Sequence, residues 1–267
     1  MLRRRLTVIL TTIVALLASG CGSSSSSSSA ASGSGSGHAA AKPTLIVSAA
    51  ASLQAAFKKY GGQFSAAESR FSFAGSDMLA AQIEQGARPD VFASANTKLP
   101  DALYAKGLVG KPVTFAANRL VLAVPANSKI TSLAGVQKPG VTLVIGSASV
   151  PIGIYTRKVL AKLGAASSAK VLADVRSNEP DVSGIVGKLV QGAADAGFTY
   201  LTDVKATAGK LKAIALPALL QPVVAYGVAV VKGSSHPAQA HKFIAGLLSG
   251  AGQADLAQAG FLSPPSK

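Results

Sequence analysis

The chain has little of what metal and redox sites need. Its 267 residues include one cysteine, three histidines and no tryptophan. A single cysteine excludes an intramolecular disulfide framework and any zinc site built from several cysteines. Acidic residues are also scarce, because 11 Asp and Glu stand against 26 Lys and Arg, which gives a formal charge of +15. An apolar content of 49% is typical of a folded protein, and the length suits one large domain or two of ordinary size.

The excess of positive charge is compatible with three kinds of partner: nucleic acid, an anionic surface and an anionic small ligand. The lysines are scattered and form no basic stripe, so the sequence predicts no nucleic-acid binding. A solvated basic surface without a specific partner stays open as the alternative.

The first twenty residues have the pattern of a secretory signal peptide. Arg3, Arg4 and Arg5 precede an apolar run over residues 6–17. A membrane-spanning helix needs about 20 apolar residues, so this run is too short to span a membrane but suits a signal. Small residues lead to Cys21 in a way that resembles a bacterial lipobox. We therefore expect residues 1–20 to be removed and Cys21 to be lipidated; an ordinary signal with a chance cysteine is the alternative.

Residues 21–42 form the next segment, in which serine, glycine and alanine dominate. Such a composition cannot bury enough apolar surface to order itself, and it is typical of a flexible tether. Together with the lipid, this tether predicts an exported protein that is anchored to the outer face of the cell membrane.

Short β-rich runs alternate with helical patterns over the rest of the chain, which predicts an α/β fold with a parallel sheet. The expected strands are 44–48, 71–73, 90–94, 119–124, 141–146, 171–175, 196–199 and 223–231. The expected helices are 53–60, 78–86, 99–106, 153–163, 182–191, 237–248 and 252–259.

Two of the expected strands, 119–124 and 223–231, are long enough to serve as crossovers between two lobes. This interpretation gives a first lobe of residues 43–119 plus 228–267 and a second lobe of residues 120–227. A ligand in such a fold lies in the crevice where the carboxyl ends of the strands face each other. Paired crossovers also suit hinge closure around a ligand.

Two serines follow strands in the first lobe. Ser52 comes after three alanines and Ser76 after Gly75, each at the start of an expected helix. We expect both to be N-cap residues, and serine often does nothing more than cap. Two helix N-termini in one lobe would also offer backbone N–H groups and positive dipole ends to an anion.

The second lobe has two further candidate sites. Pro151 opens an expected helix, and Gly153 permits a close backbone approach there, so that backbone N–H groups could meet the same anion. Tyr200 follows an expected strand and places a phenol at its carboxyl end. A tyrosine at the edge of the core is the simpler interpretation of that position.

These motifs together resemble the periplasmic molybdate-binding proteins of ABC transporters, over about residues 44–262. The matching stretches are Ser48–Leu53, Phe73–Ser76, Ala80–Ala87, Pro89–Ala95, Pro151–Tyr155, Asp181–Val182 and Gly197–Tyr200. The resemblance implies a two-lobed type II periplasmic-binding-protein fold with the ligand in the cleft between the lobes. It also implies an oxyanion bound by neutral groups alone, without direct metal ligands and without a cofactor.

Carried over position by position, the resemblance assigns five residues to molybdate binding. Ser52 and Ser76 would each give a hydroxyl and a backbone N–H, and Tyr200 would give its phenol. Ile152 and Val182 would give backbone N–H groups. Donors alone suit a fully deprotonated dianion, because every donor then faces an acceptor oxygen.

The resemblance therefore implies a monomeric, lipid-anchored receptor that binds molybdate or tungstate and delivers it to the permease of an ABC importer. A receptor for another tetrahedral oxyanion, such as sulfate, is the alternative within the same class. An exported hydrolase is a distant alternative, since the chain lacks the Gly-x-Ser-x-Gly nucleophile motif. A purely structural or adhesive lipoprotein is the third, and we expect no enzyme activity.

Overall fold

The computed structural model describes residues 42–265. The predicted signal peptide, the lipidated Cys21 and the tether up to residue 41 lie outside these described residues. Within the described part, no helix combines the length and the apolar character that crossing a membrane requires.

The first of two five-stranded sheets has the strand order β2-β1-β3-β10-β4. Strand β1 pairs in parallel with β2 and β3, whereas β10 runs antiparallel to β3 and β4. The strands are β1 (Thr44–Ala50), β2 (Glu68–Ala74), β3 (Val91–Ser94), β4 (Val113–Asn118) and β10 (Val224–Val230).

The second sheet repeats this arrangement with the order β7-β6-β8-β5-β9. Strand β6 is parallel to β7 and β8, and β5 is antiparallel to β8 and β9. The strands are β5 (Leu120–Pro125), β6 (Leu143–Gly146), β7 (Val175–Glu179), β8 (Ala196–Tyr200) and β9 (Leu211–Ala215). Each sheet thus contains three parallel strands and two further strands beside them. The expected α/β fold with two lobes is confirmed. The sheets are mixed and not parallel as expected, because two of the four strand pairs in each sheet are antiparallel.

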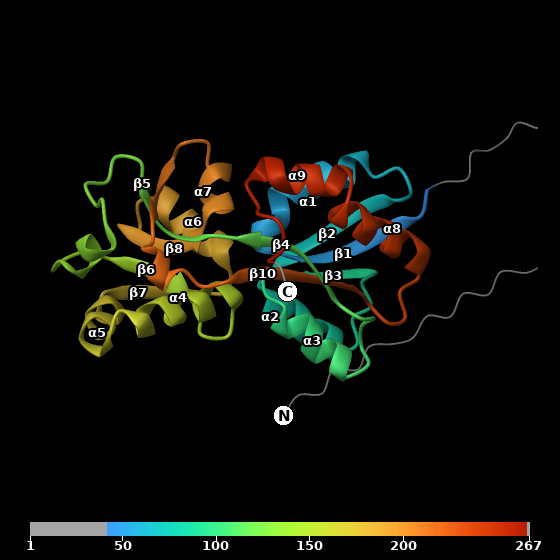
Figure 1. The fold of residues 1–267 in the computed structure, drawn as a ribbon, viewed down its shortest axis with the longest axis horizontal. Coiled ribbons are helices and arrows are strands. Elements are labelled where there is room, and N and C mark those ends of the chain that lie inside the picture. Colours follow the sequence, from blue (N-terminus) through green and yellow to red (C-terminus); the bar gives the residue numbers. More distant parts are fainter. Residues whose placement is uncertain (1–41, 266–267) are drawn as a thin grey trace, which may run out of the picture. The chain divides into compact units, whose positions relative to one another are not determined.

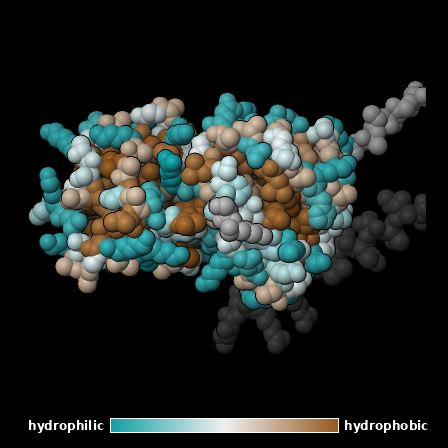
Figure 2. Space-filling model, viewed as in Figure 1, coloured by the Kyte–Doolittle hydropathy of each residue, from teal (hydrophilic) through white to brown (hydrophobic). Residues whose placement is uncertain are grey.

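Helices cover both faces of each sheet (Figure 1). On the first sheet, α1 (Gln54–Gln63), α8 (Pro237–Leu248) and α9 (Ala251–Ala259) lie on one face, and α2 (Ser76–Glu84) and α3 (Lys98–Ala105) on the other. On the second, α6 (Val182–Val190) and α7 (Leu201–Ala206) lie opposite α4 (Pro151–Lys162) and α5 (Ala165–Ala173). Because both faces are covered, β3 and β6 are buried along their whole length. Hydrophilic residues cover much of the periphery, with apolar residues between them over both halves (Figure 2).

The connections between the sheets differ from the prediction. Strands β5 and β10 are not crossovers, because each pairs within one sheet only. The chain passes to the second sheet at Arg119, between β4 and β5, and returns over residues 216–223. Strand β10 begins at Val224, before the return to the first lobe that we expected at residue 228. The first lobe boundary thus lies where we expected it, and only the second moves, from residue 228 to the connection before Val224.

One expected strand was wrong and two strands were missed. Residues 165–173 form helix α5, so the strand expected at 171–175 begins only at Val175. The segment AASSAKVLA contains four alanines, which favour a helix. Strands β4 and β9 lie at sheet edges, where the periodic apolar signal is weak.

Candidate functional site

A small cavity lies where the two sheets face each other, with a volume of about 20 Å³. A space of roughly 10–15 Å³ holds one water molecule, so this cavity suits one compact solute and excludes a sugar or a peptide. Its walls come from both sheets. The lining residues are Ala50, Ala51, Ser52, Ala74, Gly75, Ser76, Ala95, Val150, Pro151, Ile152, Asp181, Val182 and Tyr200.

Every lining residue ends or follows one of the six parallel strands. The segments after β1, β2 and β3 supply the first side of the cavity, and the segments after β6, β7 and β8 supply the second. Ligands of α/β sheets bind at the carboxyl ends of parallel strands, where loops and helix N-termini meet. All five sequence-predicted binding residues lie in this one cavity.

The two serines do not have the N-cap role that we expected. Ser52 is the middle residue of a 3-10 helix (Ala51–Leu53) that follows Ala50, and Ser76 is the first residue of α2 after Gly75. Neither N-cap makes a side-chain capping bond. The hydroxyl of Ser52 lies 2.9 Å from the hydroxyl of Tyr226, and Ser76 Oγ accepts the backbone N–H of Ala95 at 3.1 Å. Both hydroxyls are therefore held by hydrogen bonds from the first lobe.

On the second side, helix N-termini point at the cavity. Pro151 is the first residue of α4 and is followed by Ile152, while Val182 is the first residue of α6. The first N–H groups of a helix have no acceptor within that helix, and the helix dipole places partial positive charge there. The backbones at Ile152 and Val182 can therefore bind an anion, as the N-terminus of α2 can from the other side.

Gly153 approaches a different partner from the one that we expected. A methyl group on Gly153 would lie 1.8 Å from the carbonyl oxygen of Ser147 and 2.5 Å from that of Gly146. The close approach thus lets the start of α4 pack on the end of β6. Gly153 does not line the cavity.

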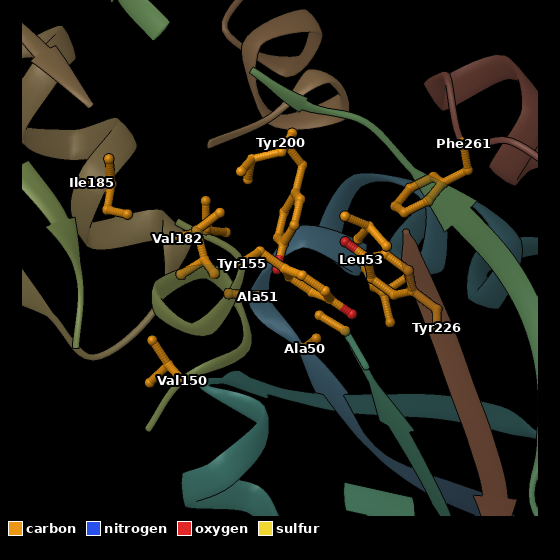
Figure 3. Packing of buried hydrophobic residues seen from close by; sticks show 14 of the residues in the cluster. Ala50, Ala51, Leu53, Val150, Tyr155, Val182, Ile185, Tyr200, Tyr226 and Phe261 are labelled. Atoms are coloured by element: carbon orange, nitrogen blue, oxygen red, sulfur yellow. The ribbon is translucent and has the colours of Figure 1, made fainter. Parts of the chain in front are cut away.

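Tyr200 ends β8 with its side chain 1% exposed. Among the described residues, its hydroxyl has no hydrogen-bond partner. Burial raises the pKa of this phenol well above its ordinary value, so Tyr200 stays protonated and can donate. Its ring meets those of Tyr155 and Tyr226 edge to face, at 6.4 Å and 6.0 Å between centroids (Figure 3). This unpartnered buried donor beside the cavity is available to a ligand atom.

No lysine, arginine or histidine lines the cavity among the residues that the structure describes, and its one acidic residue is Asp181. That carboxylate caps α6, where its Oδ1 accepts the N–H groups of Ser183 at 2.7 Å and Gly184 at 3.2 Å. Asp77, next to Ser76, does not line the cavity. The described residues also contain no cluster of three His, Cys, Asp or Glu side chains that could hold a metal ion.

The two sides of the cleft touch at Gly75. A methyl group there would lie 2.4 Å from the carbonyl oxygen of Pro180 and 3.5 Å from the side chain of Val150. Both of these neighbours belong to the second lobe. A glycine is therefore required for the cleft to close as far as it does here.

Sequence reasoning missed Tyr226, Asn118 and Ala95, which contact Ser52 or Ser76 directly or through one neighbour. Tyr226 lies in the middle of an apolar strand, a position that is typical of a core residue, and nothing near Asn118 in the sequence marks it. Ala95 contributes only its backbone, which no residue pattern reveals.

Two α/β lobes that enclose a cavity of this size between facing strand ends define the class of two-lobed solute-binding proteins. Residues 45–262 match the family described as bacterial extracellular solute-binding protein. The chain belongs to this family, which places it among extracytoplasmic proteins that bind a transported solute.

Relatives and solved structures agree with this assignment. The molybdate-binding protein ModA of Mycobacterium tuberculosis is 38% identical over 228 residues, which cover 83% of this chain and 85% of the relative. The periplasmic molybdate-binding protein of Azotobacter vinelandii superposes with a TM-score of 0.75 at 24% identity, covering 83% of this chain and all of its own. The sulfate-binding protein SubI of M. tuberculosis has a TM-score of 0.72 at 18% identity, covering 82% and 86%. These two structures share the fold.

Proposed function

We propose that this chain captures molybdate or tungstate outside the cytoplasm and delivers it to an ABC importer. The observation that carries the proposal is the meeting of Ser52, Ser76, Ile152, Val182 and Tyr200 around one cavity of about 20 Å³. The 38% identity to a relative named as a molybdate-binding protein supports the choice of anion.

The character of the cavity supports a fully deprotonated dianion. Its polar groups are hydroxyls, helix N-termini and the carboxylate of Asp181, whose Oδ1 already accepts two N–H groups of α6. The pKa of the Tyr200 phenol is raised by burial, which keeps its proton. A protonated anion would place its own hydrogen against one of these donors and leave a buried group unpaired, at a cost of about 1–3 kcal/mol. Molybdate and tungstate would then be separated from sulfate by size, since their metal–oxygen bonds are longer.

Delivery requires the cleft to open, and the tight contact at Gly75 would be broken in that step. A transporter that favours the closed, loaded form would select filled receptors. Lipidation at Cys21 and a tether over residues 21–42 would hold the receptor, acting as a monomer, close to the importer.

A receptor for sulfate or another tetrahedral oxyanion is the second candidate, and it predicts the same donors around a different ion. A hydrolase is less well supported. Asp90, Ser234 and His236 do lie together, but Ser234 Oγ donates to Asp90 at 2.6 Å and not to a histidine nitrogen. Asp90 Oδ2 also accepts the backbone N–H of Ile46 at 2.7 Å. The cluster therefore stabilises β1 and does not present a nucleophile.

The test is thermal unfolding of the purified protein with molybdate, tungstate, sulfate, phosphate and vanadate at equal ionic strength. A ligand that binds only the folded state stabilises it by about 4 kcal/mol at a thousandfold excess over Kd. We expect a large rise in Tm with molybdate and tungstate alone. A larger rise in Tm with sulfate would indicate a sulfate receptor of the same oxyanion-binding class. No rise in Tm with any anion would refute the receptor function.

A further inference from the structure

We propose that Asn118 and Tyr226 are positioning residues that force the hydroxyl of Ser52 to donate its hydrogen to the bound anion. The proposal rests on the oxyanion function above and concerns two residues outside the cavity wall. It is carried by a chain of buried hydrogen bonds that fixes the direction in which each proton points.

The chain begins at Asn118, the last residue of β4. Its Oδ1 accepts the backbone N–H of Arg119 at 2.9 Å. Because a backbone N–H can only donate, this contact fixes which end of the amide is oxygen. The amide nitrogen then faces Thr202 Oγ1 at 2.8 Å and the Tyr226 hydroxyl at 3.4 Å.

The direction of the next bond follows from the first. The amide nitrogen carries two hydrogens and no lone pair, so the Tyr226 oxygen must accept from it. Tyr226 has one hydrogen of its own, and its other hydroxyl neighbour is Ser52 at 2.9 Å. Among the described residues, Ser52 Oγ is the one acceptor within hydrogen-bond distance of the Tyr226 hydrogen, so we infer that Tyr226 donates to it. Because its oxygen already accepts the hydrogen of Tyr226, Ser52 directs its own hydrogen toward the cavity.

Burial excludes water molecules that could change the direction of these hydrogen bonds. Ser52, Asn118, Thr202 and Tyr226 are all buried, and the side chain of Tyr226 has no exposed surface. Burial also raises the pKa of Tyr226 well above its ordinary value, so the proton that it donates is retained. We call the hydrogen bonds from Asn118 through Tyr226 to Ser52 the relay. Ser76 needs no such relay, because its oxygen accepts the backbone N–H of Ala95.

The relay also joins the two lobes. Asn118 ends a strand of the first sheet, whereas Thr202 lies in α7, which follows a strand of the second. The bond between them spans the connection at Arg119. The amide that orients Tyr226 is therefore itself held by the second lobe, which links the donor state of Ser52 to the arrangement of the lobes seen here.

The difference between the two serines gives a matched experiment. Molybdate affinity is measured by titration calorimetry for Tyr226→Phe alone, in a Ser52→Ala background and in a Ser76→Ala background. Without the Tyr226 hydroxyl, Ser52 would be free to rotate, and we expect the single variant to lose about threefold to tenfold in affinity. In the Ser52→Ala background the same change should cost less than about twofold, because the hydroxyl through which Tyr226 acts is gone. In the Ser76→Ala background the full loss should persist.

An equal loss in both backgrounds, or no loss in the single variant, would overturn the relay. A merely structural role of Tyr226 would give that equal loss. If Tyr226→Phe does not fold, Asn118→Ala takes its place, and its smaller loss should likewise vanish with Ser52→Ala alone. A wild-type protein that binds no molybdate would refute the proposed function and the relay with it, whereas binding with additive losses would refute the relay alone.

Discussion

The two sides of the cleft hold their donors in different states. On the first side, Ser52 and Ser76 are each bonded to their own lobe, through Tyr226 and through the backbone of Ala95. On the second side, the Tyr200 hydroxyl is buried without any partner among the described residues. The serine oxygens of the first side are therefore bonded before a ligand arrives and leave only their hydrogens for it. The Tyr200 hydroxyl of the second side has no partner for its oxygen or its hydrogen among the described residues.

This difference separates two ways in which a side chain supports binding. A donor that already has a protein partner stabilises the fold and the complex together. A buried donor without a partner costs about 1–3 kcal/mol in the empty closed protein and recovers it on binding. Removing the two kinds of donor should thus have different effects on the unliganded protein.

The largest effect should come from Ser52→Ala combined with Ser76→Ala. Losing two donors at about 1–3 kcal/mol each would weaken molybdate binding by roughly 30-fold to 10⁴-fold. The unliganded protein should also lose stability, since both serines bond to their own lobe. Titration calorimetry and urea unfolding measure the two quantities. Unchanged affinity in the double variant would remove the serines from the site.

The next effect should come from Tyr200→Phe. One lost donor would weaken binding by about tenfold or more, but the free energy of unfolding without ligand should stay the same or rise, because no protein partner of that hydroxyl is lost. The matched control is Tyr155→Phe, whose hydroxyl meets the backbone of Ala225 and does not line the cavity. That control should lose unliganded stability while keeping more of its affinity. The same stability loss in both variants would contradict the difference between the two sides.

The smallest effect concerns two carboxyl groups, the buried Asp90 and the half-buried Asp203, and is seen only as a pH dependence. Burial, helped by Asp181, raises the pKa of Asp203 in the second lobe to about 7 from 3.8. Burial alone would also raise the pKa of Asp90 in the first lobe, but hydrogen bonds from Ser234, Ile46 and His236 outweigh it and lower that pKa. The two carboxyls should therefore respond to pH with opposite signs.

For Asp203, the folded state holds its proton up to about pH 7, whereas the unfolded state loses it near pH 3.8. Stability therefore falls as the pH rises through this window. Asp203→Asn keeps an acceptor for the N–H of Tyr200 and removes the ionisation. Its Tm should exceed that of the wild type at pH 8 and approach it at pH 4. Asp90→Asn should instead lose stability at pH 8, and a gain in both variants would contradict the assignment.

Local patterns in the sequence were enough for the parts of the site that a few neighbouring residues build. Ser52, Ser76 and Tyr200 were found because each stands where a strand ends and a helix begins, and that boundary is visible within about six residues. The strand–helix alternation predicts the α/β fold for the same reason. Even so, the expectation that both serines are N-caps was wrong, since the sequence does not reveal that the helix boundary lies one or two residues away.

The partners of those residues come from far along the chain. Ser52 and Tyr226 are 174 residues apart, and Asn118 and Thr202 are 84 apart. The edge strands β4 and β9 and the contact of Gly75 with Pro180 also depend on how the sheets pack. The positions of Ser52, Ser76 and Tyr200 and the fold class thus follow from short-range preferences of the backbone, whereas Ile152 and Val182 were assigned by the family resemblance. Which way each donor points, and which one is left without a partner, follows from packing two sheets against each other, because hydrogen-bond direction depends on every neighbour in a buried network.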